Sequence, residues 1–434
     1  MDRSLTARLS IMMFLQFFIW GAWYVTVGNY MAANGMASLT HWPYTVNPIA
    51  AIIAPFFLGL VADRYFSTEK VLAVLHLLGG AIMLFVPQLV ANPTMFILML
   101  LAYNLCYMPT LGLANSLAFH NIDDQEKQFP LIRVFGTIGW IVAGFFIAIV
   151  LGMFAGEQLP DTTPLPLYTT GVASLLLGVY CFSLPHTPPP AAGEHVSVRS
   201  ILGLDAFKQL GSRPFYVFIV SSLLLCIPLA AYYNFAPIVI KNAIYDVGVD
   251  QYGSGSSTYW ILSTVFPNPS SLMTLGQISE VVFMLLMPLF FRKLGVKWML
   301  TVGMGAWVVR YILFAAGAPG SVFWMLAGGI LMHGICYDFF FVTGQIYVDK
   351  KSTAAVRGQA QGFLVFVTYG VGMLIGAQVA GNIFNRFLGG ADALNLAQWQ
   401  DFWFVPAGFA ALVMVLFAFL FNDKVDDGAE TPAA

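Results

Sequence analysis

Charged residues are scarce in this chain of 434 residues. Only 9% of them are Asp, Glu, Lys or Arg, whereas soluble domains carry about 25%. This scarcity, together with 59% hydrophobic residues, excludes an ordinary soluble domain and indicates a protein that crosses a membrane many times. The net charge is −2 and no long basic run is present, so nothing points to nucleic acid as a partner.

Motifs of soluble enzymes are also missing. The sequence has no Walker loop, no His-Glu-x-x-His and no Cys-x-x-Cys, which argues against an ATP-driven pump. We expect no enzyme, no bound cofactor and no metal. The four cysteines fall in apolar segments, so we expect them to be packing residues rather than disulfide partners.

Windows of about 19 residues predict twelve membrane-spanning helices. They lie near residues 9–31, 44–62, 70–91, 94–118, 131–153, 166–184, 215–240, 271–291, 297–317, 321–348, 354–383 and 401–421. The longest polar stretch near the middle of the chain contains HTPPPAAGEH and divides the spans six and six. The predicted parts are an N-terminal half (1–184), a cytoplasmic linker (185–214), a C-terminal half (215–422) and a cytoplasmic tail (423–434).

Lys and Arg are distributed unevenly between alternate loops. With the N-terminus in the cytoplasm, only Lys241 and Arg386 of the 19 Lys and Arg residues lie outside, and Arg310 lies within a span. Lys and Arg in short loops are held on the cytoplasmic side. The asymmetry therefore predicts that both termini are cytoplasmic.

A weak internal repeat supports the division into halves. The run from Gly59 to Arg64 ends the second predicted span, and the run from Pro288 to Lys297 ends the eighth. Both place a small or helix-breaking residue ahead of a charged turn. Two six-helix halves with a site between them at midplane are typical of major facilitator transporters, so we predict an all-α membrane protein with that fold.

Two carboxylates, Glu280 and Asp338, lie deep inside stretches that are apolar enough to cross a membrane. An ionised carboxylate is costly in hydrocarbon, so such residues usually face a water-filled path, a partner charge or a proton relay. Gln277 lies three residues before Glu280 and shares its helix face, where both would contact a solute. The alternative is a Gln–Glu pair that is hydrogen-bonded to a neighbouring helix.

Arg133, Thr137 and Trp140 recur at i, i+4 and i+7 and form one stripe on the fifth predicted span. A guanidinium, a hydroxyl and an indole on one face suit a polar solute with a flat ring. The alternative is that Arg133 marks the cytoplasmic end of the helix and that Trp140 packs against a neighbour.

The tenth predicted span carries His333 and Tyr337 at i and i+4, and Asp338 points away from both. Asp338 is expected at the depth of Arg133. We predict that these two residues form an ion pair across the halves in one conformation, which is broken when Asp338 takes up a proton. Asp338, Arg133 and Glu280 are therefore the candidates for proton coupling.

Further polar and aromatic residues are candidates for the lining of a central cavity. They are Gln16, Trp20, Asn104, Asn115, Tyr232, Tyr233 and Asn234. For Trp20, packing is an equal alternative. His76 and Arg310 are single polar residues in apolar helices, and we expect both to be satisfied within one half.

Longer motifs resemble those of the nucleoside:proton symporters of the major facilitator superfamily. They are YMPTLGLANSLAF (107–119), FPLIRVFGTIGW (129–140), LGLDAF (202–207), QISE (277–280), YDFFFVTGQIYVDK (337–350) and AQGF (360–363). The resemblance runs essentially from end to end. It implies a bacterial inner-membrane permease that imports nucleosides with protons. It also implies functional roles for Arg133, Thr137, Gln277, Glu280 and Asp338.

The chain also departs from the well-studied nucleoside permeases. Ala230 and Tyr233 stand where they have a glutamine and an asparagine, and Trp140 and His333 replace two of their aromatic residues. The run HGICYDF…YVDKK is similar to a less characterised nucleoside-transporter branch. We expect a monomer in the lipid bilayer that carries a nucleoside with protons as the coupling ion. A sugar or amino-sugar-like solute, and a sensor that does not transport, are the alternatives.

Overall fold

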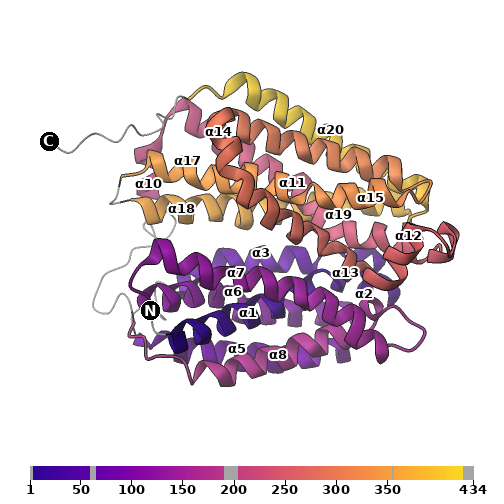
Figure 1. Ribbon diagram of the computed structural model, residues 1–434, viewed down its shortest axis with the longest axis horizontal. Coiled ribbons are helices and arrows are strands. Elements are labelled where there is room, and N and C mark those ends of the chain that lie inside the picture. The colour runs from indigo at the N-terminus through magenta and orange to yellow at the C-terminus, as the bar shows by residue number, and fades with distance from the viewer. Residues whose placement is uncertain (1–2, 59–64, 190–203, 354–355, 424–434) are drawn as a thin grey trace.

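The computed structural model describes residues 3–58, 65–189, 204–353 and 356–423, and these ranges contain helices and turns but no strand. Figure 1 shows two groups of helices lying side by side, the N-terminal helices in indigo to magenta and the C-terminal helices in rose to yellow. The predicted all-α membrane fold is confirmed.

Among the described residues, seven α-helices form the N-terminal group. They are α1 (Arg3–Tyr24), α2 (Val27–Ala33), α3 (Pro43–Phe57), α5 (Thr68–Phe85), α6 (Pro93–His120), α7 (Gln125–Phe145) and α8 (Leu165–Cys181). Local signals set their starts: α3 and α6 begin at proline, which tolerates the first turn because its missing N–H needs no partner there. The Asn92 and Asp124 side chains accept hydrogen bonds from the first turns of α6 and α7.

The C-terminal group contains eleven helical segments in the described residues. They are α10 (Leu204–Leu210), α11 (Arg213–Ile240), α12 (Ser257–Trp260), α13 (Pro269–Met273), α14 (Leu275–Gly317), α15 (Phe323–Leu331), α16 (His333–Tyr337), α17 (Thr343–Lys351), α18 (Arg357–Val365), α19 (Met373–Leu388) and α20 (Leu396–Leu420). Asn268 and Asn395 form capping boxes at the starts of α13 and α20.

Nine helical stretches in the described residues are long and apolar enough to cross a membrane. One of them, residues 269–317, covers both the eighth and ninth predicted spans, and the chain turns between them at Gly295, whose φ is 64°. The second predicted span continues past α3 into residues 59–64. That stretch, with the first member of the predicted repeat, lies outside the described residues, as do most of the linker (190–203) and the tail from 424. The count of twelve stays a prediction.

The tenth and eleventh predicted spans are broken at mid-length. A π-helical turn at Asp338–Val342 separates α16 from α17, and another at Phe366–Gly372 separates α18 from α19. Such turns shift the helical register and recur at functional sites. The side chains that follow each turn therefore point in other directions than in one regular helix.

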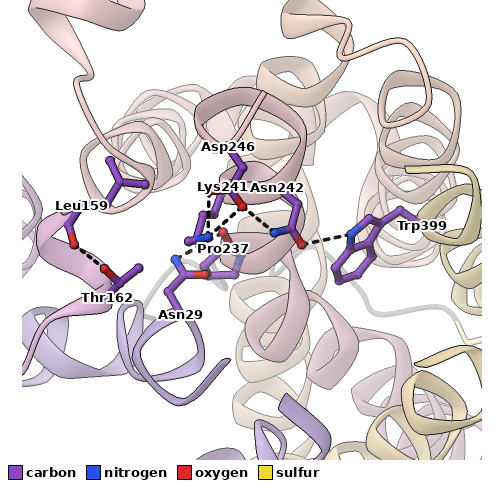
Figure 2. Close-up of polar contacts among 8 residues, drawn as sticks. All are labelled: Asn29, Leu159, Thr162, Pro237, Lys241, Asn242, Asp246 and Trp399. Atoms are coloured by element: carbon purple, nitrogen blue, oxygen red, sulfur yellow. Dashed lines mark hydrogen bonds and ion pairs between the residues drawn. The ribbon is translucent and has the colours of Figure 1, made fainter. Parts of the chain in front are cut away.

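The two halves are joined at the end opposite the start of α1, which we call the far end. Four hydrogen bonds between described residues cross the halves there. They are Asn29 Nδ2 to the Pro237 carbonyl (3.4 Å), Gln378 Nε2 to Thr45 Oγ1 (2.8 Å), Asn385 Nδ2 to the Ser38 carbonyl (2.9 Å) and the Ser270 N–H to Asp161 Oδ2 (3.4 Å). Figure 2 shows the first of these beside the Lys241–Asp246 ion pair.

Candidate functional site

A cavity of about 400 Å³ lies between the two halves and takes its lining from both. This volume falls within the range of small-molecule sites. The lining residues are Phe17, Trp20, Tyr24, Asn47, Pro48, Ala51, Met108, Leu111, Asn115, Arg133, Thr137, Trp140, Tyr233, Gln277, Glu280, His333, Tyr337, Val365, Tyr369 and Met373. The cavity is mostly apolar with a few polar groups, which suits a small organic solute.

Most residues predicted for the site do line this cavity. From the N-terminal half they are Trp20, Asn115, Arg133, Thr137 and Trp140, and from the C-terminal half Tyr233, Gln277, Glu280, His333 and Tyr337. The helical spacing that grouped them by face was therefore a sound guide to which side chains point inward.

Aromatic rings that line the cavity contact one another in a cluster. The Trp20 ring lies edge-on to Trp140, with centroids 5.5 Å apart, and edge-on to Tyr24 at 5.7 Å. Tyr24 in turn contacts Tyr233 of the other half at 5.7 Å. Trp20 thus both packs and lines the cavity. Rings in edge-to-face contact hold one another in place and leave faces on which a planar solute can stack.

Polar groups of both halves also line the cavity. Glu280 Oε2 lies 3.7 Å from His333 Nε2, and the His333 ring stacks on Tyr232 with centroids 5.6 Å apart. Arg133 lies over the Phe17 ring at 4.1 Å and within electrostatic range of Glu280. In the described residues, no group of three or more His, Cys, Asp or Glu could hold a metal ion. The site offers a cation, a carboxylate and amide groups among apolar side chains.

Of the three proton-coupling candidates, Arg133 and Glu280 line the cavity and Asp338 does not. Its side chain is fully buried, does not line the cavity, and neither carboxylate oxygen has a hydrogen-bond partner. Among the described ion pairs none joins Asp338 to Arg133, whose guanidinium stacks on Phe17 instead. The predicted Arg133–Asp338 pair is thus not formed in this conformation, in which the far end is closed.

Two expected solute contacts lie away from the cavity. Gln16 donates to Thr110 Oγ1 at 2.7 Å and contacts His76 Nε2 at 2.9 Å through its other amide atom. Asn234 is fully buried and lies outside the lining, and its backbone carbonyl packs toward Gly28 in α2. The assignment of Gln16 and Asn234 to solute contact is corrected, because the first is hydrogen-bonded within its own half and the second does not reach the cavity.

Sequence reasoning missed two polar lining residues. Asn47 donates to Asn104 Oδ1 at 2.8 Å, and Tyr369 donates to the Tyr337 hydroxyl at 2.9 Å. Each is a polar residue within a predicted membrane span, which is the signal that could have found them. Asn104 itself is buried behind Asn47. The expectation for His76 is confirmed, since both ring nitrogens have partners within one half.

Arg310 supports the site from behind. Its Nε donates to the Gly329 carbonyl at 3.0 Å, and its guanidinium lies 3.9 Å from the centre of the Tyr232 ring. Its terminal nitrogens have no hydrogen-bond partner. Because Tyr232 stacks on His333, the arginine fixes the position of a ring in the cavity wall. The expectation that Arg310 finds its partners within one half is confirmed for Nε, which donates a hydrogen bond there. The rest of the guanidinium contacts the Tyr232 ring.

Replacing Arg310 with alanine should lower the free energy of unfolding by roughly 3 kcal/mol, because it removes a charged hydrogen bond and a buried cation–π contact. Thermal unfolding in detergent, followed with a thiol-reactive dye, measures this, since all four cysteines are buried until the protein unfolds. Arg386→Ala is the matched control, because Arg386 is exposed. Equal stability of the two variants would contradict the role of Arg310.

These features define a class of membrane protein. Membrane-spanning helices in two groups, joined at one end, enclose a solute-sized cavity lined from both sides, which is the architecture of a secondary transporter. The family described as nucleoside H+ symporter matches residues 3–426, and the chain belongs to that family. It is therefore a multi-pass membrane protein of a transporter family, and the major facilitator fold is confirmed.

Known relatives agree with this assignment. The chain is 39% identical to the transporter YegT of Escherichia coli K12, over 97% of each chain. It is 31% identical to the nucleoside permease NupG of the same organism, over 99% of each. The crystal structure of the nucleoside transporter NupG superposes with a TM-score of 0.80 and 29% identity, covering 98% of this chain and 100% of the other.

Proposed function

We propose that this protein imports nucleosides together with protons by alternating access. The observation that carries the proposal is the mixed lining of one cavity between the halves, in which aromatic rings lie together with amide, hydroxyl, guanidinium and carboxylate groups. A nucleobase stacks on aromatic faces, and its polar edges and the ribose hydroxyls need donors and acceptors. The similarity of the chain to a nucleoside permease and to the structure of a nucleoside transporter supports the same cargo.

In this proposal, different residues bind the solute and take up the proton. Gln277 and Glu280 line the cavity and bind the polar edges of the solute. Asp338, buried beside the cavity without a partner, takes up the coupling proton. Its neutralisation removes an unpaired charge from the low-dielectric interior, so the protonated state favours the packed conformation. Protons are the coupling ion, and no cofactor is required.

The distribution of Lys and Arg indicates how the protein is oriented in the membrane. The far end carries Lys241 and Arg386, whereas sixteen Lys and Arg residues belong to the other side or its edge, so the far end faces outward and both termini are cytoplasmic. In a bacterium this places the protein in the inner membrane. The cavity lies within one chain, which supports a monomeric transporter.

Uptake into proteoliposomes tests the cargo. Labelled uridine or adenosine should accumulate when the outside is made acidic and should only equilibrate without the gradient. Thr137→Val, which keeps the shape of a cavity-lining side chain and removes its hydroxyl, should weaken uptake severalfold. A thermal-shift screen with nucleosides, nucleobases and amino sugars runs beside it, because a bound ligand raises stability. Stabilisation by amino sugars alone would overturn the nucleoside assignment.

A further inference from the structure

One buried carboxylate takes no part in the cavity. Asp161 lies at the far end, in a 3-10 turn at Pro160–Thr162 between α7 and α8. Its side chain is 0% exposed. One oxygen, Oδ2, accepts from the Ser270 N–H at 3.4 Å, and the other, Oδ1, has no partner. An acidic side chain buried in this way outside the membrane-spanning segments needs an explanation.

The hydrogen bond of Asp161 joins the two halves at the far end, along a line of contact that we call the seam. Ser270 belongs to α13, which leads into α14 of the C-terminal half, whereas Asp161 belongs to the N-terminal half. The packing around it is tight: a Cβ atom added at Gly144 in α7 would lie 2.9 Å from the Ser270 carbonyl oxygen. The halves cannot separate at this end without pulling Asp161 away from Ser270 and admitting water to its carboxyl.

Few charges are available to neutralise Asp161 while the seam is closed. Lys241 is the cation within electrostatic range, and it already forms an ion pair with Asp246 at 2.7 Å. The Tyr245 hydroxyl donates to the Phe266 and Asn268 carbonyls. Three described elements pack against the turn: α2 adds the phenol of Tyr30, α8 adds Tyr168 near the turn and Tyr180 and Cys181 at its opposite end, and the π-helical turn Phe146–Val150 adds no titratable group. An ionised Asp161 is therefore poorly compensated in the closed state.

We propose that Asp161 is a positioning residue of the transport cycle: its protonated form seals the far end, and its ionisation favours opening. The proposal rests on alternating access between the two halves but not on the identity of the solute. When the far end opens outward, the hydrated carboxyl releases its proton to the side from which it came. This proton is distinct from the one that Asp338 carries with the solute.

The pH range follows from the environment of the carboxyl. Burial raises the pKa of Asp161 to about 7, although the hydrogen bonds of Ser270 and the charge of Lys241 oppose the shift. In the open state water restores the ordinary pKa near 4. Between about pH 4 and about pH 7 the closed state therefore binds the proton more tightly. The ratio of open to closed protein should therefore rise about tenfold for each unit by which the pH increases in that range, and stay constant above it.

Distance measurements between the halves test this proposal. Spin labels on Glu157→Cys and Gln251→Cys, both exposed at the far end, report opening in lipid nanodiscs without any solute. We expect a short distance to dominate at about pH 5 and a longer one to grow as the pH approaches about 7. Asp161→Asn should keep the short distance at every pH. Asp250→Asn, an exposed carboxylate on the same side, should behave like the unsubstituted protein.

Further variants make the outcome decisive. Gly144→Leu should hold the far end open at every pH, because its side chain cannot fit against Ser270. If Asp161→Asn does not fold, Asp161→Glu should keep the pH dependence with a larger open fraction. Unchanged pH dependence in Asp161→Asn, or no dependence in the unsubstituted protein, would overturn the role of Asp161. Neither result bears on whether the cargo is a nucleoside.

Discussion

A protein with Asp338 replaced by asparagine should lose nucleoside accumulation in a proton gradient and keep nucleoside exchange. Asparagine has the shape of aspartate but cannot take up the coupling proton. Asp338 lies outside the cavity lining, so solute binding should survive. One pH unit supplies about 1.4 kcal/mol per proton, which supports about tenfold accumulation for one proton per solute. In the variant the ratio of inside to outside solute should fall to about 1.

The measurement compares two experiments on the same proteoliposomes. Accumulation is followed after an acid jump outside, and exchange is followed between equal pools of labelled and unlabelled solute at one pH. Asp401→Asn is the control, because Asp401 is an exposed carboxylate at the start of α20. Accumulation by Asp338→Asn equal to that of the control would contradict its role. Loss of exchange as well would indicate damage to the cavity rather than uncoupling.

The sequence was a strong guide to the site because the chain is so apolar. Glu280, Gln277 and Arg133 stand out against hydrocarbon-like surroundings, and helical spacing then shows which of them share a face. In a soluble protein the same residues would be lost among many surface charges. The fold class followed from composition and span length for the same reason.

The contacts of individual side chains were harder to predict. Gln16 shares a face with Trp20 and Tyr24, but its amide meets His76, a partner from a distant helix that local spacing cannot reveal. The predicted ion pair of Asp338 with Arg133 depends on which conformation the halves adopt, and a sequence encodes the whole cycle rather than one state of it.

The π-helical turns within the spans could not be predicted from the periodicity of the sequence either. A regular helix through residues 321–348 would carry one register from end to end, whereas the π-helical turn at Asp338–Val342 inserts a residue and changes it. Asp338 is buried while Tyr337, its neighbour, lines the cavity, as the step between successive residues of a helix predicts, and the changed register applies to the residues after the turn. The two carboxylates that looked alike in the sequence thus have different surroundings, which separates solute binding from proton uptake.

Glu280→Gln should weaken nucleoside binding by roughly 10- to 100-fold at neutral pH. A charge-assisted hydrogen bond contributes about 1.5–3 kcal/mol, and glutamine keeps the length of the side chain while removing the charge that faces Arg133 and His333. Calorimetric titration of the purified protein measures the dissociation constant. Met108→Leu, an apolar substitution in the same lining, should leave it unchanged.

The same variant separates the two roles open to Glu280. If its carboxylate binds the solute, Glu280→Gln loses affinity and exchange together, whereas Asp338→Asn keeps both. If Glu280 instead carries the proton, Glu280→Gln should bind normally and fail only to accumulate. Gln277→Ala removes a neutral partner from the same helix face and should cost less than tenfold, because neutral hydrogen bonds are weaker. A larger loss at Gln277 than at Glu280 would mean that the amide, not the carboxylate, is the main anchor of the solute.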